Sequence, residues 1–147
     1  MSRLTTHRGI VYPWQCDHNG HMNVMWYVGK FDEATWCLFA DMGLTPNYLR
    51  GSRRGMVAVE QHLTYKRELF AGDNLIISSR VLGVTNRFVR FEHSMWSNRE
   101  EPVAAIATLT GVHIDADKRS ACPFPAHVRQ DLEAAINEGS PNPRRPS

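Results

Sequence analysis

The sequence contains no apolar run long enough to cross a membrane, and its N-terminus has no apolar stretch of the kind found in signal peptides. It has only three cysteines, an odd and scattered set that does not form a disulfide framework. Neither sign of charge dominates, because 17 Lys and Arg residues face 15 Asp and Glu residues, and the net charge of +2 is too small to indicate a nucleic-acid partner. These absences predict a cytoplasmic protein with reduced thiols and with no membrane or nucleic-acid partner.

The composition is otherwise that of an ordinary globular domain, with 42% hydrophobic and 22% charged residues. A chain of 147 residues can bury one core but not two. We therefore expect a single domain over residues 1–138. Residues 139–147 are polar and rich in proline, which predicts a disordered tail.

Apolar residues recur at helical spacing over residues 24–42. Asn23, just before them, suits the N-cap of a helix, and Gly43 suits its C-terminal end. The stripe consists of Tyr27, Phe31, Ala34, Leu38, Phe39 and Met42. This pattern predicts one helix of roughly five turns.

Most of the rest of the chain predicts β-strands joined by short polar turns. The expected strands are 7–14, where Pro13 ends the hydrogen bonding, and then 56–68, 74–84, 87–96 and 103–115, with a short helix over 125–136. Short turns require antiparallel neighbours, so the fold class is α+β, with one long central helix on a curved five-stranded antiparallel sheet. One helix covers only part of such a sheet, and we therefore expect a homodimer or a homotetramer.

A polar segment, "CDHNGHMN" (16–23), precedes the predicted helix. Asp17 can simply cap a turn there, because Asp and Asn favour such loops. His21 suits a hydrogen bond that orients the loop. A metal site built on Cys16, Asp17, His18 and His21 would need further ligands from elsewhere, so we expect no metal.

The segment "VYPWQCDHNGHMNVMWYVGKFDEA" (11–34) resembles the opening of the hotdog-fold acyl-CoA thioesterases of the 4-hydroxybenzoyl-CoA thioesterase type. The positions that match in register are Asp17, Gly20, His21, Asn23, Tyr27 and Glu33. The later "YKRELFAGDNLIISSRVLGVTNRFVRFEH" (65–93) resembles the second signature of the family. The chain departs from the family at Gln15, where many members carry a second acid.

The resemblance implies a hotdog fold and the hydrolysis of an acyl-CoA thioester, with coenzyme A as part of the substrate and no other cofactor. It assigns Asp17 the role of nucleophile or general base, and the backbone N–H of Val24 the contact with the developing oxyanion. This agrees with the physical chemistry of a helix start, whose free N–H groups and dipole favour negative charge. Gly20 would allow the tight turn between them, His21 is a further catalytic candidate, and the amide of Asn23 would cap the helix and touch substrate.

The strand at 56–68 carries a second polar pair. Its alternation places Val57, Val59, Leu63 and Tyr65 on one face, and Glu60, His62, Thr64 and Lys66 on the other. The pair Glu60 and His62 either lies on a solvated face or crosses the helix start. In the second case Glu60 would position water, and His62 would contact substrate.

Other side chains are candidates for binding parts of the substrate. Arg87 and Arg90, together with Lys66, Arg67 and the basic stretch 50–54, suit the phosphates of coenzyme A. Trp14 and Trp26 flank the polar segment next to Tyr27, and an aromatic cage there would suit a quaternary ammonium group. The motifs "DHNGHMN", "VEQHLTY" and "ACPFP" are also similar to those of betainyl-CoA thioesterases.

Two other functions remain open at this point. One is a hotdog hydratase or dehydratase, which would need a histidine working with an acid on the helix, whereas His18 and His21 precede the helix. The other is a non-catalytic acyl-CoA-binding domain, against which an intact Asp17 argues. Free coenzyme A released from an acyl-CoA would distinguish the hydrolase from both.

Overall fold

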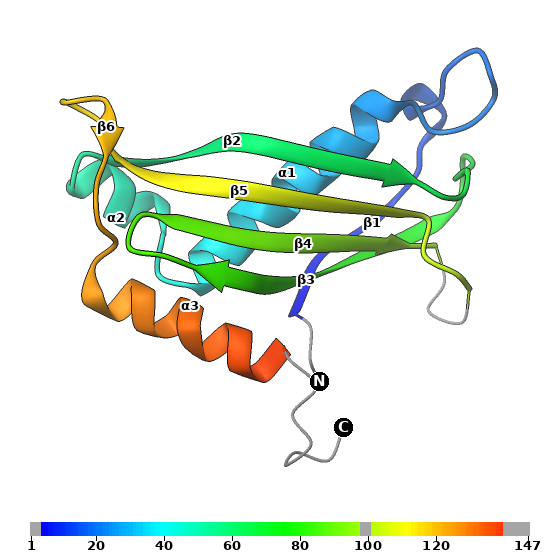
Figure 1. Ribbon diagram of the computed structural model, residues 1–147. Helices are drawn as coiled ribbons and strands as arrows, with labels where there is room; N and C mark the ends of the chain where they lie inside the picture. The colour runs from blue at the N-terminus through cyan, green and yellow to red at the C-terminus, as the bar shows by residue number, and fades with distance from the viewer. Residues whose placement is uncertain (1–3, 98–100, 140–147) are drawn as a thin grey trace.

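The computed structural model describes residues 4–97 and 101–139. Its elements follow in the order β1 (Leu4–Ile10), a 3₁₀ turn η1 (Pro13–Gln15), α1 (Val24–Asp41), α2 (Pro46–Gly51), β2 (Arg54–Tyr65), β3 (Asn74–Val84), β4 (Phe88–Trp96), β5 (Ala105–Asp115), β6 (Ser120–Ala121) and α3 (Ala126–Gly139). The strands form one sheet, and α1 lies along one of its faces (Figure 1). The predicted α+β class is confirmed.

The sheet has the strand order β1-β3-β4-β5-β2, and every pair of neighbours is antiparallel. This order contains the five predicted strands, and the two-residue strand β6 adds a sixth beside β5. Strands β1 and β2 are the outer strands of that order. Between β1 and α1, the chain passes through η1, so the strand predicted to extend to residue 14 ends at Ile10.

Helix α1 follows the predicted stripe, whose members are all buried. Its aromatic side chains meet those of β4, with Phe31 stacked on His93 at 5.8 Å and Phe39 edge-on to Phe91 at 5.3 Å between ring centroids. Gly43 takes a φ of +91° just after the helix, a conformation that strains other residues, so the chain turns there toward α2. The predicted core helix and its end are confirmed.

Two helical features differ from expectation. The segment 45–55, for which no helix was predicted, contains α2, which begins with Pro46 at its first position. The hydroxyl of Thr45 caps this helix by accepting a hydrogen bond from the N–H of Tyr48. Helix α3 continues to Gly139, beyond the end predicted at 136, and lies beside β3 (Figure 1). The tail predicted for 139–147 lies outside the described residues from position 140 onward.

A β-bulge changes the faces predicted for β2. Ala58 pairs with Gly111 and Glu60 pairs with the next residue, Thr110, so that Val59 is an extra residue without a register partner. Because side chains alternate along a strand, this insertion puts Val57 on the face opposite to Leu63. The prediction that Val57 and Val59 share a face with Leu63 and Tyr65 is therefore wrong.

Candidate active site

The polar segment forms a small hairpin that leads into α1. Cys16 pairs with Met22, the N–H of Asp17 donates to the carbonyl of His21 at 3.1 Å, and the N–H of Gly20 donates to the carbonyl of Asp17 at 2.9 Å. Gly20 has a φ of +89°, which is the conformation that the predicted tight turn requires of a glycine. Asp17 and His21 are thus cross-strand neighbours, one rung beyond the bridge.

The carboxylate of Asp17 keeps one oxygen available. Its Oδ1 accepts a hydrogen bond from the N–H of Asn19 at 2.8 Å, and its other oxygen has no partner among residues 4–97 and 101–139. The side chain is partly exposed. Asp17 therefore both stabilises the turn and presents an ionisable oxygen to solvent, so the capping role and the chemical role are compatible.

The start of α1 provides an unused backbone donor. Asn23 caps the helix through its side-chain oxygen, which accepts from the N–H of Met25 at 3.2 Å, and the N–H of Trp26 donates to the carbonyl of Asn23 at 2.9 Å. The N–H of Val24 has no hydrogen-bond acceptor within the part of the chain that the structure describes. A free N–H at the positive end of a helix dipole suits an anion or a polarised carbonyl oxygen.

A cleft of about 610 Å³ opens beside this helix start. Its lining comes from the polar segment, the first turn of α1, the end of β2 and the connection between β2 and β3. It consists of His21, Met22, Val24, Tyr27, Tyr65, Lys66, Arg67, Glu68 and Phe70. The structure thus brings five residues singled out from the sequence into one cleft, namely His21, Val24, Tyr27 and the two phosphate candidates Lys66 and Arg67. Asp17 is not among the lining residues, but its hairpin partner His21 is.

The aromatic rings of the cleft are held in defined positions. Tyr27 is buried, its hydroxyl donates to the carbonyl of Arg67 at 3.1 Å, and burial raises the pKa of its phenol above the ordinary value. Tyr65 meets Tyr27 edge to face at 5.2 Å, and Phe70 meets His21 in the same manner at 6.4 Å. Tyr65 and Phe70 are each about half exposed, so their rings face the opening.

The charged side chains of the cleft differ in their partners. Arg67 donates to Glu101 at 2.7 Å, and this hydrogen bond lowers the pKa of the Glu101 carboxyl. Glu68 Oε1 lies 3.6 Å from His21 Nε2. Lys66 has no ion-pair partner among the described residues. The partner of Arg67 therefore lies outside the cleft lining, whereas the partner of Glu68 is His21, within it.

Glu60 and His62 lie on the other face of the sheet. They alternate along β2 with Leu63 and Tyr65, and the contact of Tyr65 with Tyr27 identifies the α1 side. Both residues are exposed. This placement removes Glu60 and His62 from the cleft of their own chain, and it agrees with the solvated face that the sequence left open.

The two predicted cage tryptophans do not line the cleft. Trp14 stacks on Tyr12 with a centroid distance of 4.5 Å and is 68% exposed. Trp26 packs against the core from α1. The aromatic groups of the cleft are Tyr27, Tyr65 and Phe70 instead. Tyr65 and Phe70 were missed because nothing in the local pattern indicates that the β2–β3 connection reaches the helix start.

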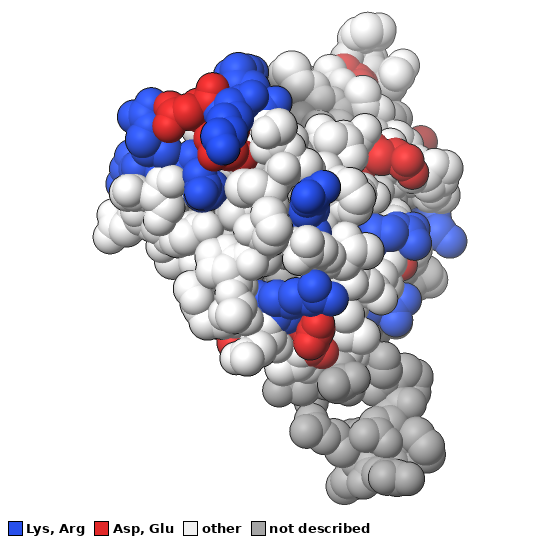
Figure 2. All heavy atoms as spheres, turned by 60° about the vertical axis from the view of Figure 1, so that its left-hand side comes forward, with Lys and Arg blue, Asp and Glu red and all other residues white. Residues whose placement is uncertain are grey.

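Arg87 and Arg90 lie at the opposite end of the sheet from the cleft. Phe88 pairs with Val112, which pairs with Val57 near the start of β2, whereas Tyr65 ends β2 eight residues later. Counted along β5, where Ala105 is the partner of Tyr65, the separation at about 3.3 Å per residue is roughly 23 Å for Phe88 beside Arg87 and roughly 17 Å for Arg90, which lies opposite Thr110. Lys and Arg side chains gather over that end of the molecule, around a few acidic ones (Figure 2). Arg53 and Arg54 there pair with Asp117 and Asp115.

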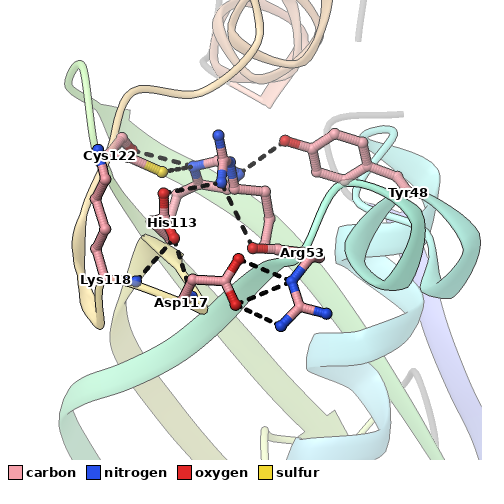
Figure 3. Close-up of polar contacts among 8 residues, drawn as sticks. Tyr48, Arg53, His113, Asp117, Lys118 and Cys122 are labelled. Atoms are coloured by element: carbon pink, nitrogen blue, oxygen red, sulfur yellow. Dashed lines mark hydrogen bonds and ion pairs between the residues drawn. The ribbon is translucent and has the colours of Figure 1, made fainter.

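A buried polar cluster holds that end of the fold together (Figure 3). His113 is fully buried, and its Nδ1 lies 3.0 Å from the carbonyl of Cys122, which can only accept, so Nδ1 carries the proton. The hydroxyl of Tyr48 then donates to Nε2 at 2.9 Å. Burial lowers the pKa of His113 and keeps the ring neutral. The cluster ties α2 and the segment after β6 to β5, a structural role distinct from the cleft.

Neither a metal site nor a membrane partner was expected from the sequence. Within residues 4–97 and 101–139, no group of three or more His, Cys, Asp or Glu side chains is arranged to hold a metal ion, including the side chains around Cys16. In the same part of the chain, none of the helices is both long and apolar enough to cross a membrane.

Residues 11–132 match the model of the thioesterase-like superfamily. The betainyl-CoA thioesterase of Pseudomonas aeruginosa is 26% identical over 131 residues, which cover 89% of this chain and 82% of that protein. The L-carnitine dehydrogenase/betainyl-CoA thioesterase of Agrobacterium fabrum is 27% identical over 130 residues, 88% of this chain but only 26% of that longer protein.

The fold is shared with solved structures. A Staphylococcus aureus protein in complex with CoA superimposes with a TM-score of 0.87 and 18% identity, over 99% of this chain and 92% of the other. The match of the family model to most of the chain, together with the antiparallel sheet around α1, settles the assignment. The chain belongs to the thioesterase-like superfamily, as a thioester hydrolase of the hotdog type.

Proposed function

We propose that the protein hydrolyses a small acyl-CoA thioester to the free acid and coenzyme A, with Asp17 as nucleophile or general base. The observation that carries this proposal is the unused N–H of Val24 at the start of α1, which opens on a cleft next to the hairpin of Asp17. A thioester carbonyl placed against that N–H would be polarised by the helix dipole.

Asp17 lies on the hairpin that leads into α1. The ladder of the hairpin runs from Asn23, whose N–H donates to the carbonyl of Gln15, through the Cys16–Met22 bridge to Asp17. Asp17 is therefore two residues, or about 7 Å along the strand, from the position opposite the cap of α1. Its free carboxylate oxygen either attacks the carbonyl carbon directly, which forms an anhydride and releases the thiolate, or accepts a proton from the attacking water.

The acyl group that we propose is betainyl. The support comes from the two curated relatives named above, both of which carry betainyl-CoA thioesterase in their names. A cleft with aromatic walls suits the trimethylammonium group of that acyl chain.

We further propose that two copies assemble through β2 and complete the site together. Within the described residues β2 pairs only with β5, so its outer edge is unpaired. Antiparallel pairing of two such edges would place the start of one β2 beside the end of the other. The basic end of the partner, with Arg87 and Arg90, would then lie near the cleft, where the phosphates of coenzyme A need cations.

The positions of the acidic side chains do not favour a hydratase or a dehydratase. Glu33 on α1 lies 3.5 Å from Nδ1 of His7 on β1 and is not among the residues that line the cleft. The histidine of the cleft, His21, lies near Glu68, which belongs to the β2–β3 connection and not to the helix. The required pairing of a cleft histidine with an acid on α1 is therefore missing among the described residues.

The proposal is tested with Asp17→Asn and the release of free thiol from betainyl-CoA. The amide oxygen of Asn can still accept from the N–H of Asn19, so this variant keeps the turn and removes only the charge. We expect kcat to fall by about 10²- to 10⁴-fold, with an unchanged melting temperature. Asp32→Asn, on the exposed side of α1, is the matched control and should retain full activity. If Asp17→Asn hydrolysed betainyl-CoA as fast as the control Asp32→Asn, Asp17 would have no role in the mechanism.

A further inference from the structure

The cleft contains one carboxylate that the proposed chemistry does not use. Glu68 lies in the lining between Arg67 and the buried Leu69, and its side chain is 61% exposed. The half-exposed rings of Tyr65 and Phe70 belong to the same lining. A carboxylate that shares a cleft with two half-exposed aromatic rings suits a quaternary ammonium group, which is attracted to both and cannot donate hydrogen bonds.

The neighbouring charges leave Glu68 free to act in this way. Arg67 adjoins it in sequence, but its guanidinium binds Glu101 and does not neutralise Glu68. His21 Nε2 lies 3.6 Å from Glu68 Oε1, a separation longer than a hydrogen bond. Lys66 adds a cation to the same cleft. The lining thus offers both signs of charge, as a substrate with a cationic acyl end and an anionic coenzyme end requires.

We propose that Glu68, with the rings of Tyr65 and Phe70, determines the preference of the enzyme for a cationic acyl group. This inference rests on the proposed function and assigns the specificity to residues outside the Asp17 hairpin. It also replaces the cage predicted at Trp14 and Trp26, which do not line the cleft. Glu68 attracts the charge of the ammonium, and the ring faces contact its methyl groups.

The experiment compares two substrates of equal shape. Betainyl-CoA carries a trimethylammonium group, and 3,3-dimethylbutyryl-CoA has a neutral carbon in place of the nitrogen. The quantity measured is the ratio of their kcat/KM values in the wild type, in Glu68→Gln and in Glu133→Gln. The last variant makes the same chemical change on α3, where Glu133 pairs with Arg129.

We expect Glu68→Gln to lower the ratio by about three- to five-fold, the effect of losing one partly exposed ion pair. The kcat/KM for the neutral substrate should fall less than that for betainyl-CoA. Raising the ionic strength should reduce the ratio in the wild type but not in Glu68→Gln, because salt screens an exposed ion pair. Tyr65→Leu should lower the ratio by about two- to five-fold, and Tyr65→Phe should restore it, since Phe keeps the ring face.

The outcomes separate this inference from the proposed function. If the wild type hydrolyses both substrates and Glu68→Gln keeps the wild-type ratio, Glu68 does not determine specificity, whereas the thioesterase proposal stands. If Glu68→Gln slows both substrates equally, Glu68 acts through His21 and the inference is overturned. If the wild type releases no coenzyme A from either substrate, these substrates do not fit the proposed function itself.

Discussion

Stability should fall in mild acid because of buried histidines, and replacing one of them, His93, should remove a predictable part of that loss. His93 is fully buried on β4, between Thr35 of α1 and Ser79 of β3. The hydroxyl of Thr35 donates to the carbonyl of Phe31, so the Nε2–H of His93 donates to Thr35 at 2.8 Å. Ser79 then donates to Nδ1 at 2.5 Å. This neutral ring has both nitrogen atoms satisfied and needs no further proton.

The size of the effect follows from the pKa of His93. Burial lowers this pKa from 6.5 to about 4 in the folded protein. As the pH falls below 6.5, the unfolded chain binds a proton at this position and the folded chain does not, so the free energy of unfolding decreases until about pH 4. Between pH 7 and pH 5, at about 1.4 kcal/mol per unit, the loss from His93 alone is about 2 kcal/mol.

The assay is urea denaturation of the wild type and of His93→Gln at pH 7 and at pH 5, at one protein concentration. Gln keeps a donor and an acceptor but does not titrate, so its unfolding free energy should lose about 2 kcal/mol less over this range. His113, whose pKa burial also lowers, leaves a residual pH dependence in both proteins. His127→Gln, at an exposed position on α3, is the control. A wild-type pH dependence in His93→Gln would refute the reasoning, whatever the absolute stability of the variant.

Two other predictions concern the helix start and the assembly. Asn23→Ala removes the cap of α1 and should lower the free energy of unfolding by about 1 kcal/mol, measured by urea denaturation. The control is Asn47→Ala, at an exposed position within α2, and equal stability of the two variants would contradict the prediction. The double variant Arg87→Ala, Arg90→Ala should raise KM for acyl-CoA by several-fold without changing kcat. Light scattering of the wild type should show a dimer or a tetramer. An active monomer, or an unchanged KM, would contradict binding of the phosphates across the interface.

The elements that the sequence predicted well are those with strong local causes. The helix over 24–41 combines an apolar stripe, a capping Asn23 and a terminating Gly43, and each of them acts within a few residues. The antiparallel pairing of β3 with β4 also followed from a local feature, the short turn at Asn86. The expectation that short turns join neighbouring strands is wrong for β2 and β3, because β2 pairs with β5, whereas β3 pairs with β1 and β4. Helix α2 was missed although Thr45 and Pro46 form a recognisable start, because its basic composition was interpreted as a loop.

The bulge at Val59 could not be predicted from alternation, because the sequence on either side of it alternates well. An extra residue exchanges the faces of everything on one side of it, so Val57 and Leu63 appear equivalent in the sequence and lie on opposite faces in the fold. Only the register against β5 reveals it. Glu60 and His62 acquired their predicted role in the cleft from the assumption that β2 crosses the helix start with that face inward.

The residues of the site also differ in whether local or long-range contacts hold them in place. Asp17, Gly20 and Asn23 act within one hairpin and one helix cap, so short-range chemistry suffices to identify them. The opposite wall of the cleft is 40 residues away in sequence, and it is in place because Tyr27 binds the carbonyl of Arg67 and the N–H of Met22 binds the carbonyl of Leu69 at 2.7 Å. These two hydrogen bonds attach the β2–β3 connection to the helix start. They also bring Glu68 and Phe70 beside His21, so the contacts that build the cleft also place the residues to which we assign the choice of acyl group.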